Sequence, residues 1–129
     1  MAWGGNWRMP TLAELNELVD TKNFNPWGSD NQTKWYWEWT TESGVNGYKI
    51  HYRADTSSES ETSYIFLPAA GYRNGTSFNN QGSYGTYWSS ALVSSSPNRA
   101  RYLDFSSGTA RMNHNYRYYG FTVRAVLSN

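Results

Sequence analysis

The sequence predicts one α+β domain made of small antiparallel sheets, one or two helices and much loop. Three observations lead to this prediction. The chain has 129 residues, which suits a single domain spanning residues 1–129. One segment near its start carries apolar residues at helical spacing, whereas several later segments alternate as strands do. Glycine and asparagine turn signals separate these later segments at short intervals.

The helix is expected over residues 11–21. Thr11 and Glu14 have the spacing of a capping box, and Pro10 precedes them. Apolar residues then recur on one helical face: Leu12, Leu15, Leu18 and Val19. The other face is expected to carry solvated carboxylates rather than a catalytic acidic pair: Glu14, Glu17 and Asp20.

The first strand is expected over residues 35–40, where every second residue is a tryptophan. A hairpin turn is indicated by Gly44 and by the pair Asn46-Gly47. Further strands are expected at residues 48–53 and 64–67. The hydrophilic stretch 55–63 then connects two strands, and later turn signals lie at residues 74–75 and 79–85.

Two further strands are expected in the last third of the chain. Leu103 and Phe105 alternate as core-facing residues of one strand. Near the C-terminus a second alternating set is expected to do the same: Phe121, Val123 and Ala125.

The tryptophans of the first strand admit two interpretations. Trp35, Trp37 and Trp39 lie on one side of an alternating strand. They either pack into an aromatic core or form an exposed platform that stacks on sugar rings. The second interpretation predicts a carbohydrate-binding surface module, which we keep as the alternative function.

Composition excludes several classes of function. The chain has no cysteine, so disulfides, thiol catalysis and thiolate metal sites are excluded. His51 and His114 do not have metal-ligand spacing, and no nucleophile elbow, phosphate-binding glycine loop or calcium loop is present. His51 is expected to be a surface or hydrogen-bonded residue. We therefore predict no enzyme, no catalytic residue, no metal and no cofactor.

Charge and hydropathy limit the classes of partner that the sequence predicts. The formal net charge is +1, which gives no nucleic-acid footprint. No run of 18 apolar residues occurs, so no membrane-spanning segment is predicted. No signal peptide is visible at Met1, and we expect a chain trimmed of any targeting segment.

The residues after Trp88 use a restricted alphabet. The first 88 residues contain 18 Lys, Glu, Gln or Trp, whereas the last 41 contain none where about eight are expected. This segment contains five arginines but only one acidic residue, Asp104. An ordinary Ser/Asn/Tyr-rich tail of a β domain is one explanation.

The genetic code supplies another explanation. If both adenines of an Asn codon become any base while the third base stays a pyrimidine, Lys, Glu, Gln, Trp and Met cannot arise. Met112 is the one departure from that alphabet after Trp88. The pattern is therefore typical of adenine-directed diversification on a retained hydrophobic skeleton.

Ordered motifs cover nearly the whole chain. They read WGGNWRMPTLAELNELVD, WTT-x-SGVNGYK, IFLPAAGYRNG, GSYGTYWSS and RYYGFTVRAV. This series resembles the Fibrobacter succinogenes major paralogous domain family, whose members have a C-type-lectin-like fold related to formylglycine-generating enzymes. The resemblance implies that fold here, but not the catalysis, because those enzymes rely on cysteines. Residues 25–34 look like an insertion relative to the family pattern.

Some members of that family resemble the variable proteins of diversity-generating retroelements, in which mutation begins near a YWSS-like motif. Here Tyr87-Trp88-Ser89-Ser90 stands at that place, so residues 88–126 are expected to be the variable, ligand-displaying region. The resemblance implies a receptor- or adhesin-type domain on a bacterial cell surface or a phage tail. Its partner would be a protein or a glycan, and its oligomeric state is left open.

Family pattern and alternation divide this region into scaffold and display positions. The scaffold set is Trp88, Ala100, Leu103, Phe105, Met112, Gly120, Phe121, Val123 and Arg124. The candidate ligand-binding positions are Leu92, Val93, Arg99, Arg101, Tyr102, Asp104, Ser106, Thr109, Arg111, Asn113, His114, Asn115, Tyr116, Tyr118 and Tyr119.

Overall fold

The computed structural model describes residues 6–19, 35–52 and 63–128. Strands dominate these residues, and they contain one helix of eight residues and four small antiparallel sheets. The α+β prediction is therefore wrong, and the C-type-lectin-like architecture is not confirmed. The elements are β1 (Trp7–Arg8), α1 (Leu12–Val19), β2 (Trp35–Glu42), β3 (Val45–Tyr52), β4 (Ser63–Pro68), β5 (Tyr72–Asn74), β6 (Ser77–Asn79), β7 (Gly85–Val93), β8 (Ser96–Ser106), β9 (Thr109–Tyr116) and β10 (Val126–Leu127).

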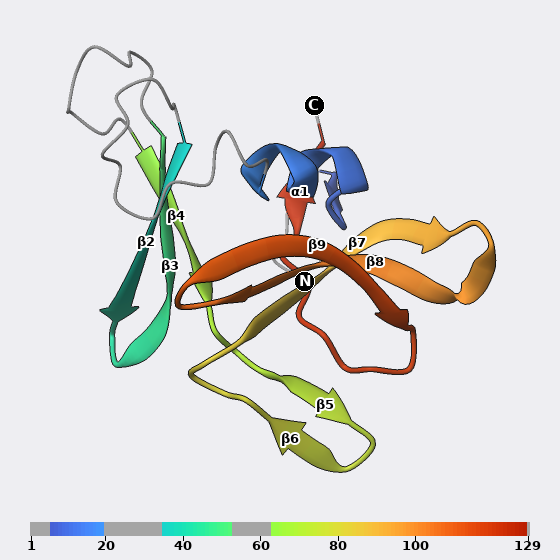
Figure 1. The fold of residues 1–129 in the computed structure, drawn as a ribbon. Helices are drawn as coiled ribbons and strands as arrows, with labels where there is room; N and C mark the ends of the chain where they lie inside the picture. The colour runs from blue at the N-terminus through green and yellow to red at the C-terminus, as the bar shows by residue number, and fades with distance from the viewer. Residues whose placement is uncertain (1–5, 20–34, 53–62, 129) are drawn as a thin grey trace.

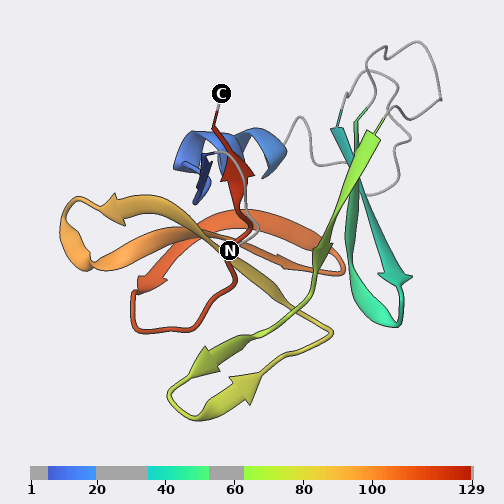
Figure 2. The ribbon, with the colours of Figure 1, turned by 180° about the vertical axis from the view of Figure 1, so that it is seen from behind.

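The sheets are arranged around one central unit, the three-stranded sheet β7-β8-β9. Figures 1 and 2 both show helix α1 and strand β10 on one side of this sheet and the β5–β6 hairpin on the other. The sheet β2-β3-β4 stands beside it, and β1 pairs with β10. The two ends of the described chain therefore meet above the central sheet.

Helix α1 begins at the predicted capping box. The backbone N–H of Glu14 donates to Thr11 Oγ1 at 3.2 Å, and the Thr11 N–H donates to Glu14 Oε1 at 2.9 Å. This reciprocal pair satisfies backbone donors that a helix start otherwise leaves unpaired. The leucine face turns inward, with Leu15 and Val19 buried. Residues 20 and 21 of the predicted helix lie outside the described residues.

The β2–β3 hairpin turns at Ser43 and Gly44, whose φ angles are 51° and 81°. Such angles favour glycine and give a hairpin its tight turn. The prediction of a turn at Asn46-Gly47 is wrong, because both residues lie in β3. Gly47 is there for space, since a Cβ atom would overlap the Leu67 carbonyl and lie 2.9 Å from the Phe66 ring.

An aromatic core joins the two three-stranded sheets. Trp37, Tyr48 and Phe105 are fully buried and meet edge to face, with ring centroids 5.0 to 6.2 Å apart. The Trp37 indole N–H donates to the Leu18 carbonyl at 2.9 Å, which ties β2 to the helix. The core also contains Leu15, Val19, Ile50, Leu67, Ala69, Tyr87 and Leu103. Burial on this scale is the main source of stability for a small β domain.

The later strands agree with the sequence only in part. Leu103 and Phe105 face the core from β8, as their alternation predicts. Residues 121–125 were expected to form a strand, but only Thr122 makes an isolated bridge there, and β10 begins at Val126. Val123, which was expected to face the core, is 47% exposed. The turn signals at residues 74–75 and 79–85 are confirmed by the β5–β6 hairpin and by positive φ angles at Gly75, Asn80 and Gly82. The connection at 55–63 and the insertion at 25–34 lie almost wholly outside the described residues.

Candidate functional site

The β8–β9 hairpin carries most of the predicted display residues. Its register pairs Leu103 with Met112 on the face that packs against the core. The next pair along, Asp104 with Arg111, lies on the opposite face because successive strand residues alternate. The hairpin therefore has a core-facing side and an outward side over its first half.

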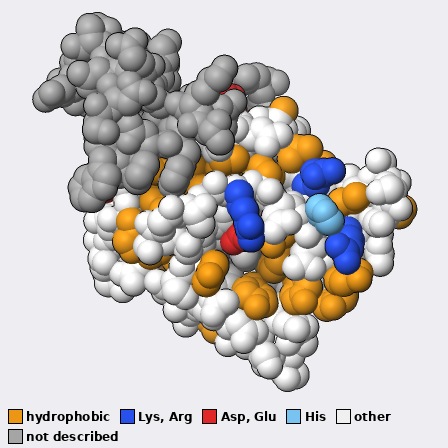
Figure 3. Space-filling model, in the orientation of Figure 1, with side chains coloured by type: hydrophobic (Ala, Val, Ile, Leu, Met, Phe, Trp, Pro, Cys, Tyr) orange, Lys and Arg blue, Asp and Glu red, His pale blue; other side chains and the backbone are white. Residues whose placement is uncertain are grey.

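The predicted positions divide between these two sides. Tyr102, Asp104 and Asn113 share the outward side, whereas Arg101 and His114 share the side of Leu103, beyond the end of the core. The candidate positions on this hairpin therefore do not all share one face. The two sides meet along β9, which is an edge strand of the sheet β7-β8-β9. Figure 3, viewed with β9 in front, shows basic side chains, a histidine and a row of hydrophobic side chains together.

Exposure sorts the fifteen candidates into three groups. The exposed group is Leu92, Thr109, Arg111, His114 and Tyr118. The half-buried group is Arg99, Arg101, Asp104, Ser106, Asn113, Asn115, Tyr116 and Tyr119. Val93 and Tyr102 are buried, at 8% and 6% exposure, so their display on the surface is a wrong prediction.

Each of the two buried candidates has a structural reason. At the end of β7, alternation turns Leu92 outward and Val93 inward. The ring of Tyr102 packs 4.5 Å from the Phe121 ring and 5.7 Å from the Trp88 ring. Phe121 lies there because the next residue, Thr122, is bonded to strand β7 on both sides of Tyr87. The Thr122 N–H donates to the Thr86 carbonyl, and the Thr122 carbonyl accepts from the Trp88 N–H. Tyr102 is therefore part of a second, smaller aromatic cluster.

A stack of flat side chains runs from this cluster around the end of β9. The Tyr119 ring lies parallel to Phe121 at 5.6 Å, Tyr118 stacks on Tyr119 at 4.8 Å, and Tyr116 stacks on Tyr118 at 5.5 Å. The Arg99 guanidinium carbon lies 4.3 Å from the Tyr116 ring centroid. We call these residues the aromatic stack. It connects the two sides of the hairpin, and Tyr118 is 67% exposed within it.

The aromatic stack borders a small polar pocket of about 190 Å³. Asp104 supplies its carboxylate, and this side chain is only 13% exposed. Arg111, which is 66% exposed, reaches the carboxylate at 3.3 Å. The pocket is lined by Tyr72, Asn80, Tyr84, Thr86, Tyr102, Asp104, Asn115, Tyr119 and Phe121. Burial, and next the charge of Asp104, raise the pKa of the Tyr102 phenol, which keeps it a proton donor.

The polar pocket is suited to binding a polar group of a ligand. Phenol hydroxyls, amides and a carboxylate around an aromatic wall can bind a hydroxyl-rich or cationic group. A cationic group from a ligand would have to replace Arg111, whose contact with Asp104 is long and exposed.

Two asparagines close the free edge of β9. The N–H groups of His114 and Tyr116 donate at 2.8 Å to the side-chain oxygens of Asn113 and Asn115. An unpaired strand edge otherwise offers such donors to any passing strand. These contacts favour recognition through side chains over addition of a partner strand.

Four of the nine residues that line the pocket were not predicted from the sequence. Tyr72, Asn80, Tyr84 and Thr86 precede the restricted segment, so its alphabet could not identify them. Tyr72 reaches the site because its neighbour Arg73 exchanges two backbone hydrogen bonds of 2.8 and 2.9 Å with Gly120, and Thr86 reaches it because β7 pairs Thr86 with Asp104. No signal in a single sequence predicts the pairing of Arg73 with Gly120.

The tryptophan platform is not supported by the structure. Trp37 is fully buried, and Trp39 is half-buried with its ring 5.0 Å from Tyr48. The side chain of Trp35 lies outside the described residues. Trp37 therefore belongs to the core, and Trp39 packs against that core with part of its surface still exposed.

Neither a metal site nor a membrane-spanning helix occurs in the described part of the chain. His51 is buried, and its ring lies 3.3 Å from the Glu38 carboxylate. Within residues 6–19, 35–52 and 63–128, no three metal-ligating side chains come together. The helix of this same part is too short and too polar to cross a membrane.

Comparison with known proteins gives a family. A family profile described as "Domain of unknown function (DUF8237)" matches residues 29–126, which is more than half of the chain. No curated protein and no solved structure matches the sequence significantly. The matched range contains β2 to β9, and with them the polar pocket and the aromatic stack. The chain therefore belongs to the DUF8237 family.

Proposed function

We propose that this protein is a non-catalytic, receptor- or adhesin-type binding domain that displays its ligand contacts on the β8–β9 hairpin and the following tyrosines. The observation that carries the proposal is the position of the restricted segment. Three of its five arginines (Arg99, Arg101 and Arg111), its histidine and its tyrosines line an exposed strand edge, the aromatic stack and the polar pocket. Its leucine and phenylalanine residues on β8 belong to the core.

The chemistry of this surface suits a protein or glycan partner. Tyrosine provides a large contact area with few rotatable bonds, and arginine provides bidentate hydrogen bonds and stacking. Asn113 and Asn115 add adaptable hydrogen-bonding groups beside them. Antibody combining sites use a similar mixture of residues for the same physical reasons.

We further propose that a retroelement diversifies this surface. Met112 supports this part of the proposal, because it is the one residue after Trp88 that the codon scheme cannot produce. Met112 is also packed against the core, opposite Leu103. A residue outside the mutable alphabet thus occupies a position where replacement would disturb the fold. On this proposal the domain works at a bacterial surface or on a phage tail.

Sequencing the same locus in many independent isolates tests the proposal. Differences should concentrate at exposed and half-buried positions after Trp88 and should follow adenines in the codons. Leu103, Phe105 and Met112 should not vary. Differences spread evenly along the chain, or equally frequent at these core positions, would contradict diversification.

A direct binding experiment tests the display face itself. Once a ligand is found with a protein and glycan array, Tyr118→Ala and Arg111→Ala should each weaken binding at least tenfold if they are anchors. Val45→Ala is the matched control, because Val45 is exposed on the distant β2–β3 hairpin. Equal losses in all three variants would place the contacts elsewhere.

A further inference from the structure

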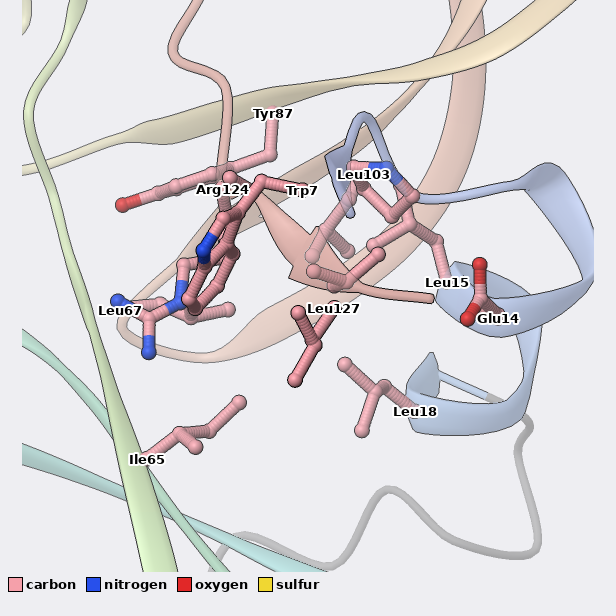
Figure 4. Close-up of a pocket in the computed structure, with 13 residues that line it drawn as sticks. Trp7, Glu14, Leu15, Leu18, Ile65, Leu67, Tyr87, Leu103, Arg124 and Leu127 are labelled. Carbon is pink, nitrogen blue, oxygen red and sulfur yellow. The ribbon is translucent and has the colours of Figure 1, made fainter. Parts of the chain in front are cut away.

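A second cavity lies on the other side of the central sheet, beneath helix α1. Its volume is about 280 Å³, and almost all of its lining is apolar. Figure 4 shows Leu15 and Leu18 from α1, Ile65 and Leu67 from β4, and Leu127 from β10 around this space. Leu103 also lines it, whereas its neighbour Asp104 lines the polar pocket, so the two sites lie on opposite faces of β8.

The two charged residues at this cavity differ in their partners. Glu14 is held by Arg8 at 2.6 and 3.0 Å and by the capping box, so its charge is already neutralised. Arg124 is exposed, and its guanidinium makes no ion pair or side-chain hydrogen bond with any residue in the described part of the chain. Figure 4 shows Arg124 and Glu14 on different sides of the cavity, with leucines between them.

A ligand that fits an apolar cavity with one available guanidinium should be mostly apolar and should carry one negative charge. We propose that this cavity binds an amphiphilic small molecule with one carboxylate, of the medium-chain fatty-acid class, whose carboxylate pairs with Arg124. The volume is roughly twice the ~150 Å³ of an apolar cavity that holds benzene, so a flexible chain of eight to ten carbons is a reasonable size. Arginine is suited to the head group because its planar donors match a carboxylate.

The site is independent of the proposed display function. It uses none of the fifteen candidate display positions, and its walls come from α1, β1, β4 and β10 together with core residues of β7 and β8. Bound ligand would bridge helix α1 to strand β4 across the core. Binding should therefore raise the melting temperature of the domain, because a ligand that binds the folded state stabilises it.

Titration of the intact chain with octanoate, decanoate and decanol tests the proposal. Binding would be followed by calorimetry and by tryptophan fluorescence, since Trp7 lines the cavity, at concentrations below micelle formation. Decanoate should bind saturably at one site and roughly 15-fold more tightly than octanoate, because each buried methylene contributes about fourfold. Absence of saturable decanoate binding would overturn the proposal. This result is also expected if another part of the chain or a second copy of it fills the cavity.

Three variants separate the head-group contact from the apolar contacts. Arg124→Gln should weaken decanoate binding about fivefold and leave decanol binding unchanged, as expected for one exposed ion pair. Leu18→Trp should block both ligands by filling the cavity, with Ile65→Phe as the second filling variant if the first does not fold. Arg111→Gln on the display face should change neither. An equal loss of decanol in Arg124→Gln, or undiminished decanoate binding in a folded filling variant, would overturn the assignment.

Discussion

Replacing Phe105 by alanine tests the aromatic core that supports the display strand. The Phe105 ring is 1% exposed, and four rings surround it at centroid distances of 5.3 to 6.5 Å: Trp37, Trp39, Tyr48 and Tyr87. Truncating a buried aromatic residue typically costs about 3–5 kcal/mol. Its partner on β7 is Gly85, which has no side chain to fill the space left behind. We therefore expect a loss in the upper half of that range.

Urea denaturation followed by far-ultraviolet circular dichroism measures this loss. With a slope of about 2 kcal/mol per molar urea, the midpoint should fall by roughly 2 M. Tyr118→Ala is the control, because its ring is 67% exposed and such changes usually stay within about 0.5 kcal/mol. A loss below about 1.5 kcal/mol for Phe105→Ala, or equal losses in the two variants, would refute this description of the core.

The close contact between Gly85 and the Phe105 ring allows a second test of the packing around Phe105. A Cβ atom at Gly85 would overlap the Phe105 ring, so Gly85→Ala should destabilise the wild-type protein. In the Phe105→Ala background the ring is gone, and the same substitution should cost clearly less. Additive losses in this double-mutant cycle would show that the two residues are not in contact.

Three further changes have expected outcomes. Thr11→Ala should lower the free energy of unfolding by about 1 kcal/mol because it removes the acceptor for the Glu14 N–H, whereas Thr11→Ser should nearly preserve it; equal denaturation midpoints for all three proteins would contradict the cap. Hydrogen bonds from Arg8, then from Thr11, lower the pKa of Glu14 to about 2, so its contribution to stability is present above its ordinary pKa near 4.5 and is lost as the pH falls toward 2. Thermal melts of Glu14→Gln should therefore show a weaker fall of melting temperature over that window than wild type, and parallel curves would exclude the Arg8 pair. Burial raises the pKa of Tyr48 to about 12, so the contribution of Tyr48 to stability is present below pH 10 and is lost as the pH rises toward 12. The melting temperature of Tyr48→Phe should therefore fall less than that of wild type over this window. An equal fall in the two proteins would contradict the burial of Tyr48.

Local chemistry explains which parts of the fold could be predicted from the sequence. The capping box lies within four residues and needs no tertiary context, so the start of helix α1 is where Thr11 places it. Strand alternation correctly assigned Leu103 and Phe105 to the core for the same reason. The tertiary pairings that complete the structure are longer in range. The bonds between Arg73 and Gly120, and between Thr86 and Thr122, decide where Tyr72 and Phe121 lie.

The candidate site shows the same limit at the level of single residues. Tyrosine is compatible with both a surface and a core, so the alphabet could not separate buried Tyr102 from exposed Tyr118. Asn46-Gly47 has the composition of a hairpin turn, but Gly47 is needed for close approach of β4. In both cases the deciding factor is a neighbour that is distant in sequence: Phe121 for Tyr102, and Leu67 for Gly47.

A pair of randomised libraries tests the central claim most directly, namely that the display face can change while the core stays folded. The first library randomises six exposed or half-buried positions with codons that exclude Lys and Glu: Arg99, Arg101, Arg111, Asn113, His114 and Tyr118. The second randomises six buried positions in the same way: Tyr48, Ile50, Leu67, Tyr87, Leu103 and Phe105. Protease resistance of the displayed clones measures folding, and selection against unrelated proteins and glycans measures binding. The account predicts that most clones of the first library stay folded and yield binders, while few of the second fold. Similar losses of folding in both libraries, or no binders from the first, would contradict it.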